Sequence, residues 1–155
     1  MVAKIPVFKI IEGLLFHRIK RRAVFFLLMK LAGLAKTLTL KPVSAIINRS
    51  ARAMSAHLDD LEQQLSDSGG PWICGDQFTL ADVGMMVVFD RLREGDWLNL
   101  LTRDRPAVEG YWSALQRRPS YAKGCLDFAH PAVVAATTEL AGLKQAGLWP
   151  SDLPR

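Results

Sequence analysis

The apolar positions of this chain recur at helical spacing, and no stretch shows the strict alternation of a half-buried strand. Between residues 43 and 65 the apolar side chains fall three or four positions apart, as in a helix with one buried stripe: Val43, Ile46, Ile47, Met54, Leu58, Leu61 and Leu65. Similar patterns predict helices over residues 4–35, 80–93, 106–118, 119–128 and 132–146. We therefore expect an all-α protein, a bundle of five or six helices.

Glycine and proline separate these helices. The segment Ser-Asp-Ser-Gly-Gly-Pro at 66–71 is typical of a helix end followed by a turn. Pro42, Pro106 and Pro119 suit the first turn of a new helix, where a missing amide hydrogen costs nothing. No internal repeat or low-complexity segment interrupts the chain, so we expect one domain over residues 1–155.

The helix expected at 80–93 carries a complete N-terminal cap in its sequence. Thr79 is the predicted N-cap: its hydroxyl can accept a hydrogen bond from the amide of Asp82, whose carboxylate can accept one from the amide of Thr79. Phe78 and Val83 are placed to form a hydrophobic staple around this cap. After Asp82 the helix is apolar on nearly every side, which predicts a buried central helix.

These residues also carry a family resemblance. The motifs Trp-Ile-Cys-Gly-Asp at 72–76 and Phe-Thr-Leu-Ala-Asp at 78–82 resemble the entrance to the core helix of the all-helical C-terminal domain of glutathione transferases. Segments 58–65, 105–112 and 115–121 resemble neighbouring helices of that domain, in the same order. The resemblance covers residues 58–128 and does not reach the tail at 131–155. It implies a glutathione-transferase C-terminal-like helical bundle.

In that family a thioredoxin-like N-terminal domain activates glutathione. The resemblance therefore implies that this chain supplies the hydrophobic-substrate side and dimer contacts of a glutathione-dependent transferase, and is not self-sufficient for catalysis. Glutathione would be a co-substrate only if such a domain were supplied. The implied partners are a second copy or the thioredoxin-like domain, and a hydrophobic small molecule that would contact Phe8 and Phe16 in the first helical region. The periodicity of these two aromatic residues alone favours the alternative, a place in the core. The alternative is a stand-alone, non-catalytic binding or protein-interaction module.

The residues themselves show no catalytic constellation. Capping explains Asp82, and the histidines have no cysteine or carboxylate at metal-ligand spacing: His17, His57 and His130. A glycine-rich phosphate loop and a nucleophile elbow are both missing from the sequence. The acidic residues of the second helix are expected on its solvated face: Asp59, Asp60 and Glu62. We therefore expect no catalytic residue and no metal site in this chain.

Composition fits a compact helical domain, because 50% of the 155 residues are hydrophobic and 23% are charged. The apolar run at 23–29 is far shorter than the roughly 20 residues that span a bilayer. The order of apolar and basic residues near the start does not match a secretory signal peptide. Cys74 and Cys125 form neither a disulfide framework nor a zinc site, so we expect two buried thiols in a reducing cytoplasm.

The chain carries a net charge of +5, and its densest basic run is His-Arg-Ile-Lys-Arg-Arg at 17–22. Such a run can attract anionic lipid, nucleic acid or an acidic partner in a salt-dependent way. The simpler interpretation, which we favour, is a solvated helix face. No nucleic-acid motif accompanies the run and no aromatic residues are arranged to stack bases. We therefore disfavour nucleic acid and membrane as partners.

Overall fold

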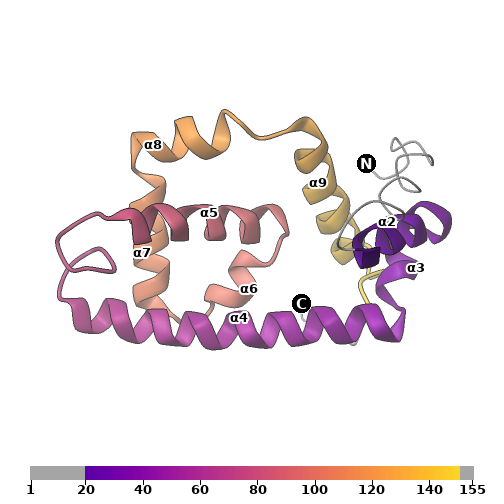
Figure 1. The fold of residues 1–155 in the computed structure, drawn as a ribbon, viewed down its shortest axis with the longest axis horizontal. Helices are drawn as coiled ribbons and strands as arrows, with labels where there is room; N and C mark the ends of the chain where they lie inside the picture. Colours follow the sequence, from indigo (N-terminus) through magenta and orange to yellow (C-terminus); the bar gives the residue numbers. More distant parts are fainter. Residues whose placement is uncertain (1–19, 151–155) are drawn as a thin grey trace. The chain divides into compact units, whose positions relative to one another are not determined.

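A computed structural model describes residues 20–150 of the chain, and over this range the structure is helical without strands. The eight α-helices of this range are α2 (Lys20–Ala32), α3 (Leu34–Leu38), α4 (Lys41–Ser68), α5 (Leu80–Glu94), α6 (Leu98–Thr102), α7 (Pro106–Gln116), α8 (Pro119–Tyr121) and α9 (Pro131–Gln145) (Figure 1). A π-helical segment, η2 (Ala122–Leu126), continues α8. The predicted all-α class is confirmed. The described chain contains more helices than the sequence indicated, because α3, α6 and α8 are short separate helices.

The described residues belong to two compact units, one formed by residues 20–48 with 142–150 and the other by Arg49–Ala141. In the first unit α2 and α3 pack together. Gly33 separates them with φ of +81°, a backbone conformation that favours glycine. The hydroxyl of the buried Thr37 donates a hydrogen bond to the Gly33 carbonyl at 2.8 Å, which satisfies a polar group inside this unit.

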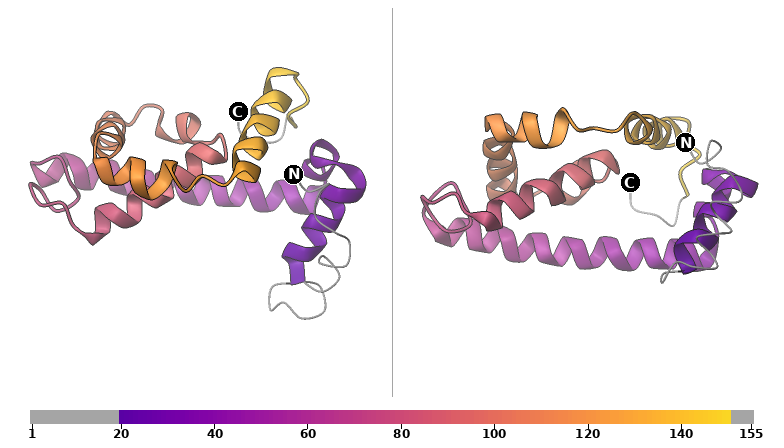
Figure 2. Two further views of the ribbon diagram at one scale, coloured as in Figure 1. Left: turned by 90° about the horizontal axis from the view of Figure 1, so that it is seen from above. Right: turned by 45° about the horizontal axis from the view of Figure 1, so that its top comes forward.

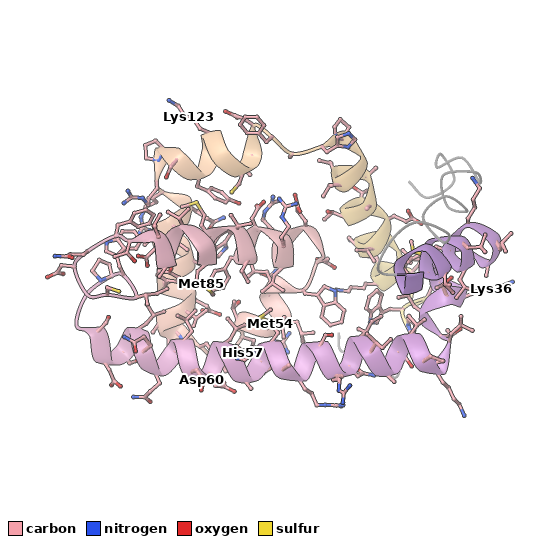
Figure 3. The ribbon with its side chains drawn as sticks, in the orientation of Figure 1. Lys36, Met54, His57, Asp60, Met85 and Lys123 are labelled. Atoms are coloured by element: carbon pink, nitrogen blue, oxygen red, sulfur yellow. The ribbon has the colours of Figure 1, made fainter. Side chains whose placement is uncertain are left out.

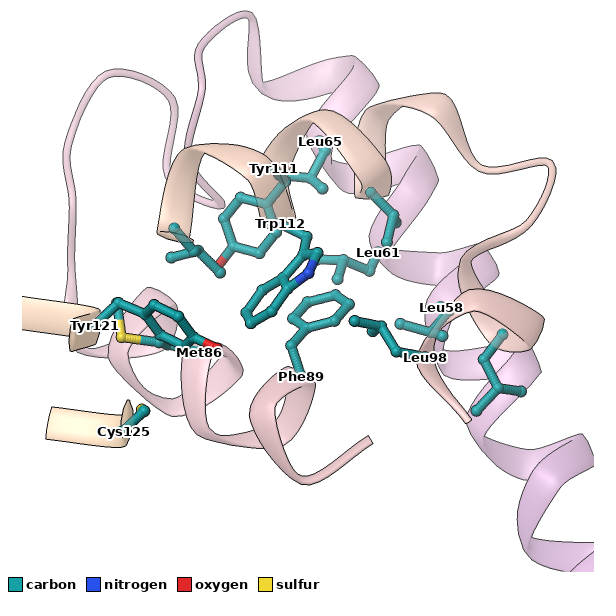
Figure 4. Close-up of a cluster of buried hydrophobic side chains, with 13 residues drawn as sticks. Leu58, Leu61, Leu65, Met86, Phe89, Leu98, Tyr111, Trp112, Tyr121 and Cys125 are labelled. Carbon is teal, nitrogen blue, oxygen red and sulfur yellow. The ribbon is translucent and has the colours of Figure 1, made fainter. Parts of the chain in front are cut away.

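The hydrophobic core of the second unit draws side chains from five helices and the π-helical segment. In the two further views α5, α6 and α7 lie along the second half of α4 (Figure 2). The core residues are Leu58, Leu61, Leu65, Met86, Phe89, Leu98, Leu101, Val108, Tyr111, Trp112, Leu115, Tyr121 and Cys125. Phe89 is fully buried and stacks on Trp112 with ring centroids 5.4 Å apart, at the centre of this cluster (Figure 4). Met54 of α4 and Met85 of α5 are partly buried and pack against this cluster (Figure 3).

Helix α5 buries one face only. Met86, Phe89 and two aspartates point into the unit, whereas Leu80, Val83 and Val87 are 87%, 43% and 49% exposed. These three side chains recur at i, i+3 and i+7, so they share one side of the helix. We call them the α5 apolar face. The expectation that α5 is buried on nearly every side is thus corrected, because no described element covers this face.

Polar contacts tie α4 to the start of α7. The Glu62 carboxylate accepts hydrogen bonds from the amides of Ala107 and Val108, at 3.0 and 2.8 Å, and so caps α7 from a neighbouring helix. Arg105 donates to the Asp59 carboxylate at 2.8 Å and to the Ser55 hydroxyl at 2.7 Å. The expected solvated face is therefore wrong for Glu62, which lies against the N-terminus of α7.

Candidate functional site

The turn before α5 is held in one shape by its backbone. The amide and carbonyl of Trp72 pair with the carbonyl and amide of Gly75 at 3.0 and 3.1 Å. Gly75 has φ of +74°, and a Cβ on Gly70 would lie 2.3 Å from the Gly75 carbonyl carbon. Both positions therefore require glycine. The turn carries Ile73 at its tip and presents that residue's amide to the first turn of α5.

Asp82 is buried and accepts hydrogen bonds from several parts of this region. Its Oδ2 accepts from the amide and hydroxyl of Thr79 at 2.7 and 3.1 Å, and its Oδ1 accepts from the Ile73 amide at 3.1 Å and the Tyr111 hydroxyl at 3.0 Å. The Thr79 hydroxyl in turn accepts from the Ala81 amide at 3.3 Å, and the geometry is that of a capping box. One carboxylate thus joins the turn, α5 and α7.

Phe78 is held by aromatic and cationic neighbours. Its ring lies edge-on to Trp72 with centroids 5.0 Å apart, and the Arg118 guanidinium carbon lies 3.5 Å from its centroid. Val83 belongs to the α5 apolar face. A staple between Phe78 and Val83 stays a prediction, whereas the Arg118 contact is a feature that the sequence did not indicate.

A second buried carboxylate lies on the same helix. Asp90 has no exposed surface and accepts a hydrogen bond from the Tyr121 hydroxyl at 3.0 Å. Arg93 donates to it at 2.7 and 3.0 Å, and Arg91 at 2.9 Å. Asp90 therefore joins α8 to α5. Sequence reasoning missed this aspartate, although an acidic residue at the end of an apolar helical run was an available signal.

The surroundings fix the protonation of these groups. Burial alone would raise the pKa of Asp82, but hydrogen bonds from the Thr79 and Ile73 amides and from two hydroxyls outweigh burial and lower it. Burial likewise opposes the ionised form of Asp90, and the bonds from Arg93 and Tyr121 lower its pKa. Burial and the hydrogen bond to an aspartate raise the pKa of Tyr111 and of Tyr121. At neutral pH both carboxylates are ionised and both phenols keep their protons.

These shifts predict acid sensitivity. The pKa values of Asp82 and Asp90 are lower in the folded state, so their stabilisation is complete above the unfolded value of about 4 and is lost as the pH falls through the folded values. The free energy of unfolding, measured by urea titration between pH 7 and pH 3, should decrease below about pH 4. Asp82→Asn should flatten this dependence, and Asn at the exposed Asp76 should not. Equal slopes for Asp82→Asn and the unaltered chain would contradict the prediction.

The remaining residues that the sequence singled out take no part in the hydrogen bonds of Asp82 or fall outside the described range. Phe8, Phe16 and the start of the basic run 17–22 lie outside the described residues. Within residues 20–150 no group of three or more histidine, cysteine or acidic side chains could hold a metal ion. Cys125 is buried, and burial together with the charge of Asp90 raises its pKa. Cys74 is exposed in the turn, so the expectation of two buried thiols is wrong for this residue.

Together these features define an all-helical domain built around a capped core helix with buried carboxylates. Residues 48–123 match the family model described as "Glutathione S-transferase, C-terminal domain". The matched residues run from the first half of α4 into the π-helical segment and include Asp82 with every residue that donates a hydrogen bond to its carboxylate. The chain therefore belongs to the glutathione S-transferase superfamily and carries its C-terminal helical domain.

Curated relatives share part of this domain. The chain is 32% identical over 77 residues to "Glutathione S-transferase TCHQD" of Arabidopsis thaliana, a match covering 50% of this chain and 28% of that protein. It is 36% identical over 77 residues to "2,5-dichlorohydroquinone reductive dechlorinase" of two Sphingobium indicum strains, covering 46% of this chain and 22% of those proteins. The match thus spans less than a third of each relative. No solved structure matches the chain significantly. Among the described helices, none is long and apolar enough to cross a membrane.

Proposed function

We propose that this chain provides the hydrophobic-substrate side of a glutathione-dependent transferase and that a thioredoxin-like domain provides glutathione activation. The α5 apolar face carries this proposal. Three apolar side chains on one side of the central helix are exposed: Leu80, Val83 and Val87. Exposed apolar surface of this kind marks an interaction site, because burying each such side chain contributes about 1.5–3 kcal/mol.

The two tyrosines of the chain support this division of labour. Activation of glutathione needs a group that stabilises its thiolate, commonly by donating a hydrogen bond. Tyr111 and Tyr121 are the only tyrosines in the sequence, and the hydroxyl of each donates a hydrogen bond to a buried aspartate. Both hydroxyls are buried inside the domain. Neither tyrosine is therefore available to donate a hydrogen bond to a thiolate outside the domain, which supports a donor supplied by the thioredoxin-like domain.

The relatives and the cysteines extend the proposal. One relative is named a glutathione S-transferase, and two are named for reduction of a chlorinated hydroquinone. These names favour glutathione as co-substrate and a small aromatic electrophile as substrate. Dimer formation, typical of the family, would add a second copy as partner. Cys74 and Cys125 are free thiols, which suits a reducing compartment such as the cytoplasm.

The proposal predicts that association of this chain with a thioredoxin-like domain depends on the α5 apolar face. The purified chain alone should not conjugate glutathione to an aromatic halide, and adding a separately expressed thioredoxin-like domain of a glutathione transferase should produce a complex that does. Val83→Asp should weaken that complex about tenfold or more, because about 1.4 kcal/mol of lost apolar contact is enough for this effect. Association is measured by calorimetry and conjugation by absorbance.

The matched control is Val134→Asp on α9, where the valine is 54% exposed. It should leave association unchanged. Conjugation by the chain alone, or unaltered binding of Val83→Asp, would contradict the proposal. If the chain binds apolar dyes by itself but does not bind a thioredoxin-like domain, the result would support the stand-alone binding module instead.

A further inference from the structure

A surface cavity lies between the end of α4, the turn before α5 and one face of α7. Its volume is about 250 Å³. Its apolar walls include Leu65, Pro71 and Ala114, and Tyr111 also lines it, with its hydroxyl bonded to Asp82. All of these residues belong to the second unit. The cavity is separate from the α5 apolar face, whose residues do not line it.

The volume of the cavity limits the class of ligand. An apolar cavity of about 150 Å³ in another protein is known to hold benzene. A volume of about 250 Å³ therefore accommodates one aromatic ring with a small substituent. It lies just below the usual range for drug-sized ligands, about 300–1,000 Å³. The volume of the cavity thus favours a single-ring compound over a larger molecule.

The charge at the cavity favours an anion. Arg117 is the charged residue among those that line it, and no carboxylate lines it. Within the described part of the chain, Arg117 takes no part in the ion pairs, which involve Arg91, Arg93 and Arg105. A guanidinium offers two parallel donors that match a carboxylate. An arginine beside apolar walls therefore suits a ring that carries a carboxylate.

The glycine at position 110 leaves space in the cavity that a larger side chain would fill. Glycine in a helix interior is less stable than alanine. A Cβ at Gly110 would meet no atom within 4 Å, so packing does not require glycine at this position of α7. Gly110 lines the cavity, and a side chain there would occupy its space. The missing side chain preserves room for a ligand.

From this geometry we propose that the cavity binds a small aromatic carboxylate, with the ring against Tyr111 and Ala114 and the carboxylate on Arg117. The inference does not rest on the proposed transferase function. Binding requires only the second unit, and it would hold equally for a stand-alone module. Loss of the thioredoxin-like partner would therefore leave it intact.

The test is calorimetric titration of the full chain with benzoate, and with benzamide as the neutral analogue. Benzoate should bind, and benzamide should bind at least about tenfold more weakly, as expected for loss of a charge-assisted hydrogen bond. Arg117→Gln should cause a similar loss. Arg103→Gln removes the same charge from an exposed residue outside the cavity and should leave the affinity unchanged.

Gly110→Leu tests the space itself. It should abolish benzoate binding while the melting temperature is kept or raised, because leucine is the better helix former. Gly110→Ala should raise the melting temperature and reduce binding less. The proposal is overturned if benzoate does not bind, if benzamide matches it, or if Arg117→Gln or a folded Gly110→Leu binds benzoate as tightly as the unaltered chain.

Discussion

Replacing Asp82 with alanine is expected to lower the free energy of unfolding by about 3–5 kcal/mol, the size found when one partner of a buried charged network is removed. The substitution leaves the Ile73 amide, the Tyr111 hydroxyl and the Thr79 amide without the carboxylate that accepts their hydrogen bonds. Loss of a helix cap alone costs about 0.5–2 kcal/mol. The excess over that range reflects the bonds to the turn and to α7.

Urea titration at neutral pH measures this effect. Thr79→Ala should cost only the cap, about 0.5–2 kcal/mol. Asp76→Ala, an exposed carboxylate six positions earlier in the chain, should change stability by less than about 0.5 kcal/mol. Tyr111→Phe and Asp82→Ala should be non-additive, since they remove the same hydrogen bond. A loss no larger for Asp82→Ala than for Thr79→Ala would show that Asp82 acts as a cap only.

The parts of the fold that depend on local sequence were predictable. The spacing of leucines in the second half of α4 predicts its buried stripe, and Leu58, Leu61 and Leu65 are core residues. The partners of the α5 cap lie within four residues, so Thr79 and Asp82 could be recognised from their separation alone. Helix propensity and capping act over one or two turns, which is why these features can be read from sequence.

Features that depend on residues far apart in the chain could not be predicted. The Tyr111 hydroxyl that bonds Asp82 is 29 residues away, and the α7 amides that bond Glu62 are 45 and 46 residues away. A polar stripe on α4 predicts which residues avoid the core, but not that a helix terminus lies against one of them. Tertiary packing therefore decided the environment of Glu62.

The sides of α5 illustrate the same limit. An apolar pattern all round a helix shows that several faces avoid water, but it does not show which neighbours cover them. In the described structure Met86 and Phe89 face the core, and Val83 and Val87 do not. The cavity beside Arg117 could not be predicted from the sequence either, because its space depends on how α4, the turn and α7 pack together.

The two buried aspartates act at opposite ends of α5 and fasten different neighbours. Asp82 joins α7 and the preceding turn, and Asp90 joins α8 through Tyr121. Arg91 and Arg93 also contact Asp90, but their side chains are 56% and 36% exposed. Without the aspartate, water can accept hydrogen bonds from these two guanidinium groups. The Tyr121 hydroxyl is buried, so solvent water does not reach it to accept its hydrogen bond. Loss of Asp90 should therefore act mainly on the position of α8.

Replacing Asp90 with alanine should cost about 2–4 kcal/mol, since it removes a buried acceptor and unpairs a buried hydroxyl. Urea titration measures the loss, with Asp127→Ala, an exposed aspartate, as the control. Tyr121→Phe should cost about 1 kcal/mol and be non-additive with Asp90→Ala. Stability alone would not show that α8 is the element released.

The thiol of Cys125 supplies that second measurement. Cys125 is buried in η2, which continues α8, and burial together with the Asp90 charge raises its pKa. In a Cys74→Ser background, which removes the exposed thiol, Asp90→Ala should make Cys125 react faster with a thiol reagent at pH 8, because the thiolate is less disfavoured and η2 opens more often. Asp82→Ala, compared at equal global stability, should accelerate this reaction less. An unchanged Cys125 rate in Asp90→Ala would show that Asp90 does not hold α8 in place.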